Sequence, residues 1–286
     1  MFKNAESIAF QKTPVNLEQF QRDGFIGPFP LLDKKEINLV LKACLANIPN
    51  PFLPNPLARH VAVRRMAELG SHQNIVSKIT PVLGPDLLLW GSQVIKQKPS
   101  KKKRFHVDAE FSAIEGVSAW LGLKNVVSKK TFLLVAGSHN IKQSPQELNK
   151  QGGLDITDGD AVEEAAKKLN PACRLIRVDM KDGEFIIFHG RLWHGTENNT
   201  AKPRYAINFR YSTPSERVRL SKDGELPEAH WEEETPVCVM ASGADHWKVN
   251  KTIKLSEINK IKAILKGALY YFPKNLLKKF VLKRRR

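Results

Sequence analysis

The feature that most constrains the fold is a change of pattern near residue 87. From there to residue 212 the chain consists of short apolar or alternating segments separated by turns, a pattern typical of β-strands. The seven segments are LLLWGSQVI, RFHVDAEF, SAWLGLK, TFLLVAGS, CRLIRVDM, GEFIIFHG and RYAINFRYS. Strands that follow a run of helices predict an antiparallel sandwich or jelly roll with helices packed outside. We therefore expect a mainly β fold with flanking helices.

Helical patterns precede these strands. LEQFQRDGF predicts a short helix that ends near Gly24, followed by an extended FIGPFPLL. Asp33 is expected to cap the helix KKEINLVLKACLA, with Glu36 in the capping-box position. LARHVAVRRMAEL and QNIVSKITPVLG predict two further helices, and the prolines of IPNPFLPNP predict an irregular loop before them. Within the strand region, Asp160 is expected to open the helix AVEEAAKKL, with Glu163 at its third position.

Composition limits the class of protein. A chain of 286 residues with 42% hydrophobic and 26% charged residues is typical of a globular protein with a sizeable core. Cys44, Cys173 and Cys238 are widely scattered, which argues against a disulfide framework or a zinc–cysteine site and favours a reducing compartment. Because the chain shows neither a secretory leader nor an apolar run long enough to span a bilayer, we expect a cytoplasmic protein.

The net charge of +17 is unevenly distributed. Ten basic residues and no acidic residue follow Glu257, and a second basic concentration includes Lys96, Lys98 and residues 101–104. We expect a single domain over residues 1–257 and a basic amphipathic tail over residues 258–286. Such a chain should attract polyanions: nucleic acid, anionic lipid or a phosphorylated substrate.

Two histidines and an aspartate form a potential metal site. In KKKRFHVDAEF, His106 and Asp108 are two residues apart, so an extended strand places both side chains on one face. His194 follows a strand and a turn in GEFIIFHGRLWHG. Two histidines and one carboxylate on one face of a metal are the facial triad of non-haem iron(II) oxygenases. This arrangement leaves open positions for a bidentate 2-oxo acid and for oxygen.

Two arginines, Arg204 and Arg210, follow His194 in the sequence. Arg204 lies ten residues after His194 and begins a strand whose alternation places Ala206, Asn208 and Arg210 on its own face. A guanidinium group is well shaped to hold the remote carboxylate of a 2-oxo acid through paired hydrogen bonds. Arg204 is therefore the expected cosubstrate anchor.

The sequence resembles the phytanoyl-CoA dioxygenase (PhyH-like) family of Fe(II)/2-oxoglutarate-dependent oxygenases. The resemblance covers most of residues 17–212 and is carried, in order, by FQRDGFI, LLDKKEINLV, HVD, AWLGL, FLLVAGSH and HGTENNTAKPR. H-x-D alone is weakly specific, whereas the motifs together, in this order, are strongly specific. The chain departs from the family at Ala136, where proline is usual, and at the basic residues 101–104.

The resemblance implies a double-stranded β-helix, which is a cupin-like jelly roll, with Fe(II) bound by His106, Asp108 and His194. Related halogenases carry a small apolar residue at the position of Asp108, so a carboxylate there implies hydroxylation or desaturation. No catalytic residue is expected beyond the metal site, because the metal carries the chemistry.

The resemblance also implies a cosubstrate pocket. It places 2-oxoglutarate on Arg204, with help from the hydroxyl group of Thr196, and it places Trp120 and Gln93 along the pocket. The implied reaction uses O2 and converts 2-oxoglutarate to succinate and carbon dioxide while an unactivated C–H bond is hydroxylated. Ascorbate is the expected reductant.

Several other residues have alternative interpretations. His139 and His189 are expected to be structural, and Trp90 and Trp193 to lie in the core. Arg210 is either a clamp for an anionic substrate or an arginine in a salt bridge within the sheet. The run of Lys101, Lys102, Lys103 and Arg104 is either a solvated loop or part of the active-site mouth, where the last three would contact substrate.

The tail IKAILKGALYYFPKNLLKKFVLKRRR interleaves lysines with aromatic and aliphatic residues. This pattern suits either an anionic membrane surface or a solvated tail, and nucleic acid is disfavoured because no binding fold accompanies the charge. We expect a cytoplasmic enzyme, peripheral on the inner face of the cytoplasmic membrane, of unspecified oligomeric state.

The expected substrate is anionic and lipid-linked or phosphorylated. The best match among relatives is the hydroxylation of the 3-deoxy-octulosonic acid (Kdo) sugar of lipid A-core in lipopolysaccharide biosynthesis. The alternatives are hydroxylation of an acyl-CoA or of a small polar metabolite, and a non-catalytic anion-binding β-sandwich.

Overall fold

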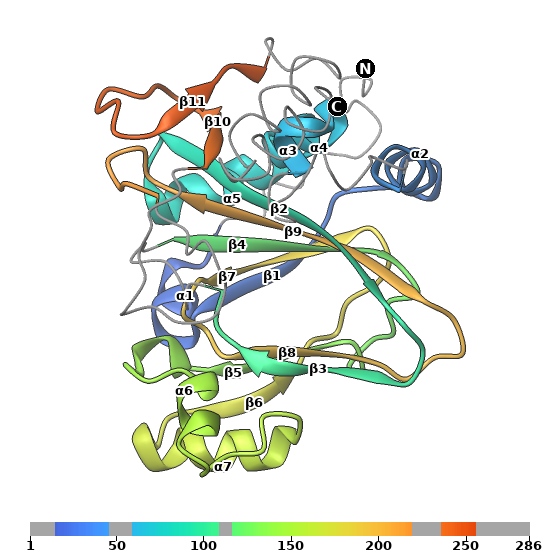
Figure 1. The fold of residues 1–286 in the computed structure, drawn as a ribbon, viewed down its shortest axis with the longest axis vertical. Helices are drawn as coiled ribbons and strands as arrows, with labels where there is room; N and C mark the ends of the chain where they lie inside the picture. Colours follow the sequence, from blue (N-terminus) through green and yellow to red (C-terminus); the bar gives the residue numbers. More distant parts are fainter. Residues whose placement is uncertain (1–14, 46–58, 109–115, 219–235, 256–286) are drawn as a thin grey trace, which may run out of the picture.

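Two β-sheets form the centre of the molecule in the computed structural model, which describes residues 15–45, 59–108, 116–218 and 236–255 (Figure 1). The larger sheet has the order β1-β7-β4-β9-β2-β10-β11 and the smaller one β3-β8-β5-β6. Among the strands that the structure describes, only β10 and β11 pair in parallel. The strands are β1 (Phe25–Pro30), β2 (Leu87–Gln97), β3 (Lys101–His106), β4 (Val117–Lys124), β5 (Phe132–Ala136), β6 (Arg174–Arg177), β7 (Glu184–His189), β8 (His194–Asn198), β9 (Arg204–Ser212), β10 (Val237–Ser242) and β11 (Lys251–Ile253).

Helices cover the outer face of each sheet. Figure 1 shows α2, α3, α4 and α5 above the large sheet and α6 and α7 beside the small sheet, whereas α1 leads into β1. The result is the mainly β jelly roll with flanking helices that the sequence predicts. The helices are α1 (Leu17–Asp23), α2 (Lys34–Cys44), α3 (Arg59–Ala62), α4 (Arg64–Gly70), α5 (Gln73–Leu83), α6 (Pro145–Lys150) and α7 (Gly159–Leu169), with a 3-10 turn, η2, at Ser138–Asn140.

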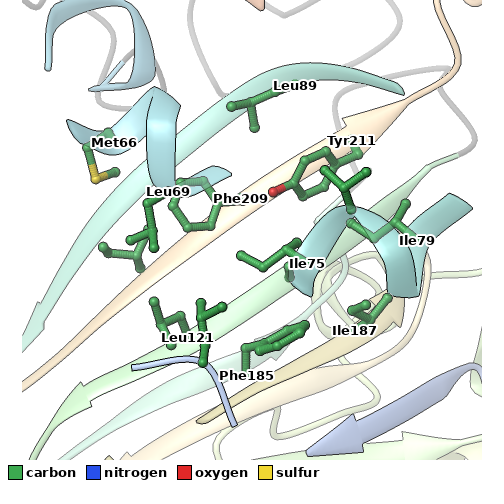
Figure 2. Packing of buried hydrophobic residues seen from close by; sticks show 14 of the residues in the cluster. Met66, Leu69, Ile75, Ile79, Leu89, Leu121, Phe185, Ile187, Phe209 and Tyr211 are labelled. Atoms are coloured by element: carbon green, nitrogen blue, oxygen red, sulfur yellow. The ribbon is translucent and has the colours of Figure 1, made fainter. Parts of the chain in front are cut away.

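The main hydrophobic core lies between the helices and the large sheet. Figure 2 shows side chains of α4 and α5, among them Leu69 and Ile75, packed against Phe209 and Tyr211 of β9. Side chains alternate along a strand, so the other face of β9, which includes Ala206 and Asn208, is turned toward the small sheet. This inward face is where a site between the two sheets can be built.

Aromatic side chains fill one part of the space between the sheets. Trp120, Phe132 and Phe188 belong to one buried cluster, with ring centroids 5.0 Å apart for Trp120 and Phe132 and 5.5 Å apart for Phe132 and Phe188. Trp193 is fully buried on the opposite side of the small sheet, among residues that contact α6 and α7. Its prediction as a core residue is confirmed.

The local signals at two helix ends are confirmed. Gly24 ends α1 with a φ of 80°, in the left-handed region that glycine adopts at little cost. Asp33 and Glu36 form the expected reciprocal capping box at the start of α2. Both signals are local, so they do not depend on tertiary contacts.

Three expectations about local structure are wrong. The helix predicted over LARHVAVRRMAEL is two helices, because Val63 has extended angles, φ −120° and ψ 101°, between α3 and α4. Asp158, not Asp160, caps α7, because its side chain accepts a hydrogen bond from the backbone N–H of Asp160. Residues 101–104 belong to β3 rather than to a loop, because they pair with β8.

Some elements were not expected. They are β8, β10, β11, η2 and α6, the last with a capping box between Ser144 and Glu147. The proline-rich loop IPNPFLPNP and the tail over residues 258–286 lie outside the described residues. None of the helices in the described part of the chain is both long and apolar enough to cross a membrane.

Candidate functional site

Three potential ligands meet between the two sheets. His106 ends β3, Asp108 follows two residues later, and His194 begins β8, where it pairs with His106 in the strand register. One potential ligand atom of each side chain lies within 4.8 Å of the other two. In the described part of the chain, these three residues are the cluster of histidine, cysteine and acidic side chains that could hold a metal ion. The Nε2 atoms of His106 and His194 lie 3.9 and 4.0 Å from Oδ1 of Asp108. The structure thus brings together the three residues that the sequence pattern selects.

Backbone carbonyls orient both histidine rings. Nδ1 of His106 lies 2.9 Å from the carbonyl oxygen of Arg104, and Nδ1 of His194 lies 2.9 Å from that of Leu192. A hydrogen bond donated by Nδ1 leaves the lone pair on Nε2 directed at the common centre, as a metal ligand requires. The ring of Phe132 stacks on His194 at a centroid distance of 5.7 Å, which restricts its rotation and excludes water on that side.

Donors from two strands hold the Asp108 carboxylate. Oδ2 accepts hydrogen bonds from Ser118 Oγ on β4 and Asn208 Nδ2 on β9, both at 2.7 Å, and Oδ1 accepts one from Arg210 Nη2 at 2.7 Å. Burial alone would raise the pKa of Asp108, but the charges of Arg210 and the two histidines and the hydrogen bond from Arg210 hold that pKa well below its ordinary value. The carboxylate is therefore ionised and available to a cation.

Arg204 is fully buried at the start of β9. Its Nη2 donates to Oε1 of Gln97, whereas Nε and Nη1 have no hydrogen-bond partner among the described residues. The guanidinium carbon lies 5.2 Å from the centre of the Trp120 ring. Burial lowers the pKa of Arg204 to about 10, so the group stays charged at neutral pH. A buried charge with unused donors is costly unless an anion is bound beside it.

Gln97, at the end of β2, connects the two expected cosubstrate anchors. Its Oε1 accepts hydrogen bonds from Arg204 and, at 3.1 Å, from Thr196 Oγ1. Its Nε2 donates to the carbonyl oxygens of Lys101 and Thr196. Sequence reasoning missed Gln97, because its place opposite Arg204 follows from the register of β2 with β9. The available signal was its position on the same face as Gln93, four residues earlier.

The other predicted pocket residues lie on neighbouring strands. Trp120 is buried in β4 and contacts Arg204 as described. Gln93 is half-buried in β2 opposite Asn208, and its role stays a prediction. Arg104 is exposed near the end of β3, and the side chains of Lys102 and Lys103 lie outside the described part of the structure. Substrate contact by these three residues stays a prediction.

His139 and His189 lie apart from the three-residue group, whereas Arg210 contacts it. Arg210 forms a salt bridge, as one of its two interpretations predicts, and its partner is the potential metal ligand Asp108. His139 and His189 lie together, with ring centroids 5.4 Å apart. Nε2 of His139 lies 3.1 Å from the carbonyl oxygen of Gln21, and Nδ1 of His189 accepts a hydrogen bond from the backbone N–H of Arg191. Neither histidine belongs to the three-residue group around Asp108.

A jelly roll with two histidines and a carboxylate between its sheets is the architecture of non-haem iron oxygenases. The family model for phytanoyl-CoA dioxygenase (PhyH) matches residues 20–206, more than half of the chain. The chain therefore belongs to the phytanoyl-CoA dioxygenase family, and by class it is an iron(II)- and 2-oxoglutarate-dependent dioxygenase. No curated protein sequence matches it significantly.

Solved structures share the fold. The non-heme monooxygenase ThoJ in its apo form has a TM-score of 0.61 and 18% identity, over 89% of this chain and 95% of that chain. CytC3 has a TM-score of 0.57 and 19% identity, over 83% of this chain and 91% of that chain, and another structure of it contains Fe(II) and alpha-ketoglutarate. The alpha-ketoglutarate-dependent epimerase SnoN from nogalamycin biosynthesis has a TM-score of 0.52 and 18% identity, over 71% of this chain and 82% of that chain.

Proposed function

We propose that this chain is a hydroxylase that holds iron(II) on His106, Asp108 and His194 and 2-oxoglutarate on Arg204. The observation that carries the proposal is the fully buried Arg204, whose Nε and Nη1 lack a partner in the described part of the chain. A dicarboxylate that reaches from the metal to Arg204 would satisfy this charge. Thr196 lies two residues after His194 on β8 and, through Gln97, contacts Arg204, so it lies along the path that such a molecule would take.

Side chains and backbone carbonyls of the protein orient the potential ligands and control their charge. The histidine Nδ1 contacts orient both rings, the donors from Ser118, Asn208 and Arg210 keep Asp108 ionised, and the aromatic cluster around Phe132 keeps water away. When bound, iron(II) with 2-oxoglutarate and O2 supplies the oxidising chemistry. The overall reaction converts R–H, 2-oxoglutarate and O2 into R–OH, succinate and carbon dioxide. Ascorbate would keep the iron reduced between cycles.

The proposed substrate is anionic and lipid-linked, with the Kdo sugar of lipid A-core as the best candidate. The net charge of +17 supports an anionic substrate. The basic residues 101–104 lie on β3, the strand that ends in the potential ligand His106, and this closeness along the chain supports an anionic substrate. We further propose that the chain acts in the cytoplasm, attached peripherally to the inner face of the cytoplasmic membrane.

The test is oxygen uptake by the purified protein with iron(II), 2-oxoglutarate and ascorbate, supplied in turn with lipid A-core precursors, acyl-CoAs and small polar metabolites. Stimulation by lipid A-core precursors, with a product heavier by one oxygen atom, is the expected result. Stimulation by acyl-CoAs alone would replace the lipid-linked substrate with the acyl-CoA alternative. Stimulation by neither of these pools but by a polar metabolite would retain the hydroxylase and reject both lipid substrates.

A further inference from the structure

A second group of unsatisfied polar atoms lies beside Asp108 and serves neither metal nor cosubstrate in the arrangement described above. Asn208, Arg210 and Ser212 alternate along β9 and so share its inward face. In the described part of the chain, Asn208 Oδ1, Arg210 Nε, Arg210 Nη1 and Ser212 Oγ are buried without a hydrogen-bond partner. The indole N–H of Trp90, on the adjacent strand β2, is also buried without a hydrogen-bond partner in the described part of the chain. Four side chains with unsatisfied buried polar atoms on two paired strands indicate a shared recognition site.

The register brings these side chains together. Arg210 pairs with Gly91, and Ser212 pairs with Leu88, on either side of Trp90. The guanidinium carbon of Arg210 lies 5.8 Å from the centre of the Trp90 ring, and its Nη2 lies 2.7 Å from Oδ1 of Asp108. The guanidinium of Arg210 is thus close to the ring of Trp90 and to the carboxylate that is a proposed metal ligand.

The salt bridge with Asp108 does not use the full donor capacity of Arg210. A guanidinium has five N–H donors, and the side-chain hydrogen bond of Arg210 within the described part of the chain uses one nitrogen. The residue is 7% exposed, so solvent does not satisfy the other two nitrogens. Unpaired buried donors on a charged group are among the costliest features of a protein interior, and they persist where a ligand completes them.

We infer that Arg210, with Ser212 and Trp90, forms a subsite for an anionic group of the substrate, and that Asn208 accepts a hydrogen bond from a neighbouring hydroxyl group. The inference rests on the proposed function and deepens it. The free donors of Arg210, Ser212 and Trp90 suit a carboxylate or phosphate oxygen, whereas the free Oδ1 of Asn208 can only accept. A ligand that offers both an anion and a hydroxyl is a hydroxylated organic acid, such as a sugar acid.

The position of the subsite also restricts which C–H bonds of the substrate can be attacked. Because Arg210 touches the carboxylate of a proposed metal ligand, an anion on its other nitrogens lies next to the metal. The C–H bond that becomes C–OH is therefore a few bonds from the anionic group. A sugar acid meets this condition. An acyl-CoA does not, because a long pantetheine arm separates its phosphates from the acyl carbons.

The experiment measures binding of two probes to the full-length protein loaded with iron(II) and 2-oxoglutarate under anaerobic conditions, by titration calorimetry. The probes are free 3-deoxy-octulosonic acid and its methyl ester, which has the same hydroxyl groups without the charge. We expect the acid to bind the wild-type protein at least about tenfold more tightly than the ester, since a hydrogen-bonded charge pair is typically worth that much.

Three variants locate the effect. Arg210→Lys, which keeps the charge but loses the paired donors, should weaken binding of the acid by about 10- to 100-fold. Ser212→Ala and Trp90→Phe should each weaken it by about 3- to 10-fold, and neither side chain is among the hydrogen-bond donors that hold Asp108, which are Ser118, Asn208 and Arg210. These two variants keep the test decisive if Arg210→Lys folds poorly. Arg177→Lys, at an exposed position on β6, is the matched control and should bind the acid as the wild type does.

Iron content and 2-oxoglutarate affinity separate this inference from the proposed function. If the wild-type protein binds neither, the proposed function fails. If it binds both, but acid and ester bind equally or Ser212→Ala and Trp90→Phe bind the acid like the wild type, the subsite is overturned while the oxygenase stands. A third arm uses lipid A-core precursors. Binding of these but not of the free acid identifies the lipid-linked form as the ligand, and binding of neither overturns the sugar-acid assignment.

Discussion

Asp108 depends on residues from two other strands for its position and its charge. Ser118 on β4 and Asn208 and Arg210 on β9 hold the carboxylate that follows β3. The sequence places Asn208 and Arg210 on the face of Arg204 but gives no reason to connect them with Asp108, because that contact requires two sheets to face each other. The grouping of His106, Asp108 and His194 could be predicted, because their chemistry and spacing are visible in the chain.

Replacing any one of His106, Asp108 and His194 by alanine should abolish iron-dependent hydroxylation. Removing one of three facial ligands weakens iron binding and disturbs the positions left open for the cosubstrate and oxygen. Iron content after anaerobic loading and 2-oxoglutarate-dependent oxygen uptake are the measurements. His139→Ala is the control and should retain iron, because His139 lies outside the group of three. Near-normal activity in two of the three ligand variants would show that the metal is bound elsewhere.

Arg204→Ala should raise the dissociation constant for 2-oxoglutarate sharply, with a loss of about 2–5 kcal/mol, as is typical for truncating a buried charged partner. Thr196→Ala should have a smaller effect in the same direction. Gln97→Glu should also weaken binding, because its carboxylate would pair with Arg204 in place of the cosubstrate. Calorimetric titration of the iron-loaded variants measures all three. Unchanged affinity in Arg204→Ala would move the anchor to another residue.

His189 should make the protein less stable in acid. Burial, followed by the charges of His139 and Arg191, lowers the pKa of His189 from its ordinary value of 6.5 to about 4. Between pH 6.5 and pH 4, the unfolded chain therefore binds a proton at this histidine that the native state does not bind. The free energy of unfolding falls over this range by up to about 3 kcal/mol. Thermal unfolding of His189→Asn, whose side-chain oxygen can still accept the Arg191 N–H, should show a smaller decrease over this range. His246→Asn, on the exposed β10–β11 connection, should behave like the wild type.

At the level of elements, local signals and long-range pairing differ in how well the sequence reveals them. The end of α1 at Gly24 and the capping box of α2 are encoded within a few residues, and both are confirmed. β8 was not expected, because HGTEN carries no apolar alternation and becomes a strand only by pairing with β3 and β5. The break between α3 and α4 at Val63 was not expected either, because the sequence pattern of this segment predicts one continuous helix.

Gly24→Ala should destabilise the junction between α1 and β1. The left-handed φ of 80° costs an alanine roughly 1–2 kcal/mol, and its Cβ would come within 2.5 Å of the His139 ring. A lower melting temperature is the expected result. Gly152→Ala is a matched control, because that glycine also has a φ of 80° but no atom lies within 4 Å of the added Cβ. If both variants lose the same stability, backbone strain rather than the His139 contact determines the cost.

At the scale of the whole molecule, the order of helices and strands led to the correct fold class because the change of pattern near residue 87 is strong. The pairing of the strands into two sheets could not be derived in the same way. The charge distribution, with ten basic residues after Glu257, is visible in the sequence but lies outside the described residues, so its role stays a prediction.

Deleting residues 274–286 removes seven positive charges and should abolish co-sedimentation with anionic vesicles at low salt, because each basic residue near such a surface contributes on the order of 1 kcal/mol. High salt should weaken binding of the full-length protein as screening increases. The truncated form should still decarboxylate 2-oxoglutarate with a soluble substrate fragment. Equal sedimentation of the two forms at low salt would exclude the tail as a membrane anchor and favour the acyl-CoA alternative.

The position of β3 at the edge of the four-stranded sheet has a further consequence. An edge strand presents unpaired backbone groups that can pair with the same edge of another molecule, and lysines on such a strand oppose this pairing by mutual repulsion. All four residues of 101–104, on this edge strand, are basic. Whatever they contribute to substrate binding, basic residues on an edge strand are expected to oppose intermolecular sheet formation along the strand that ends in the potential ligand His106.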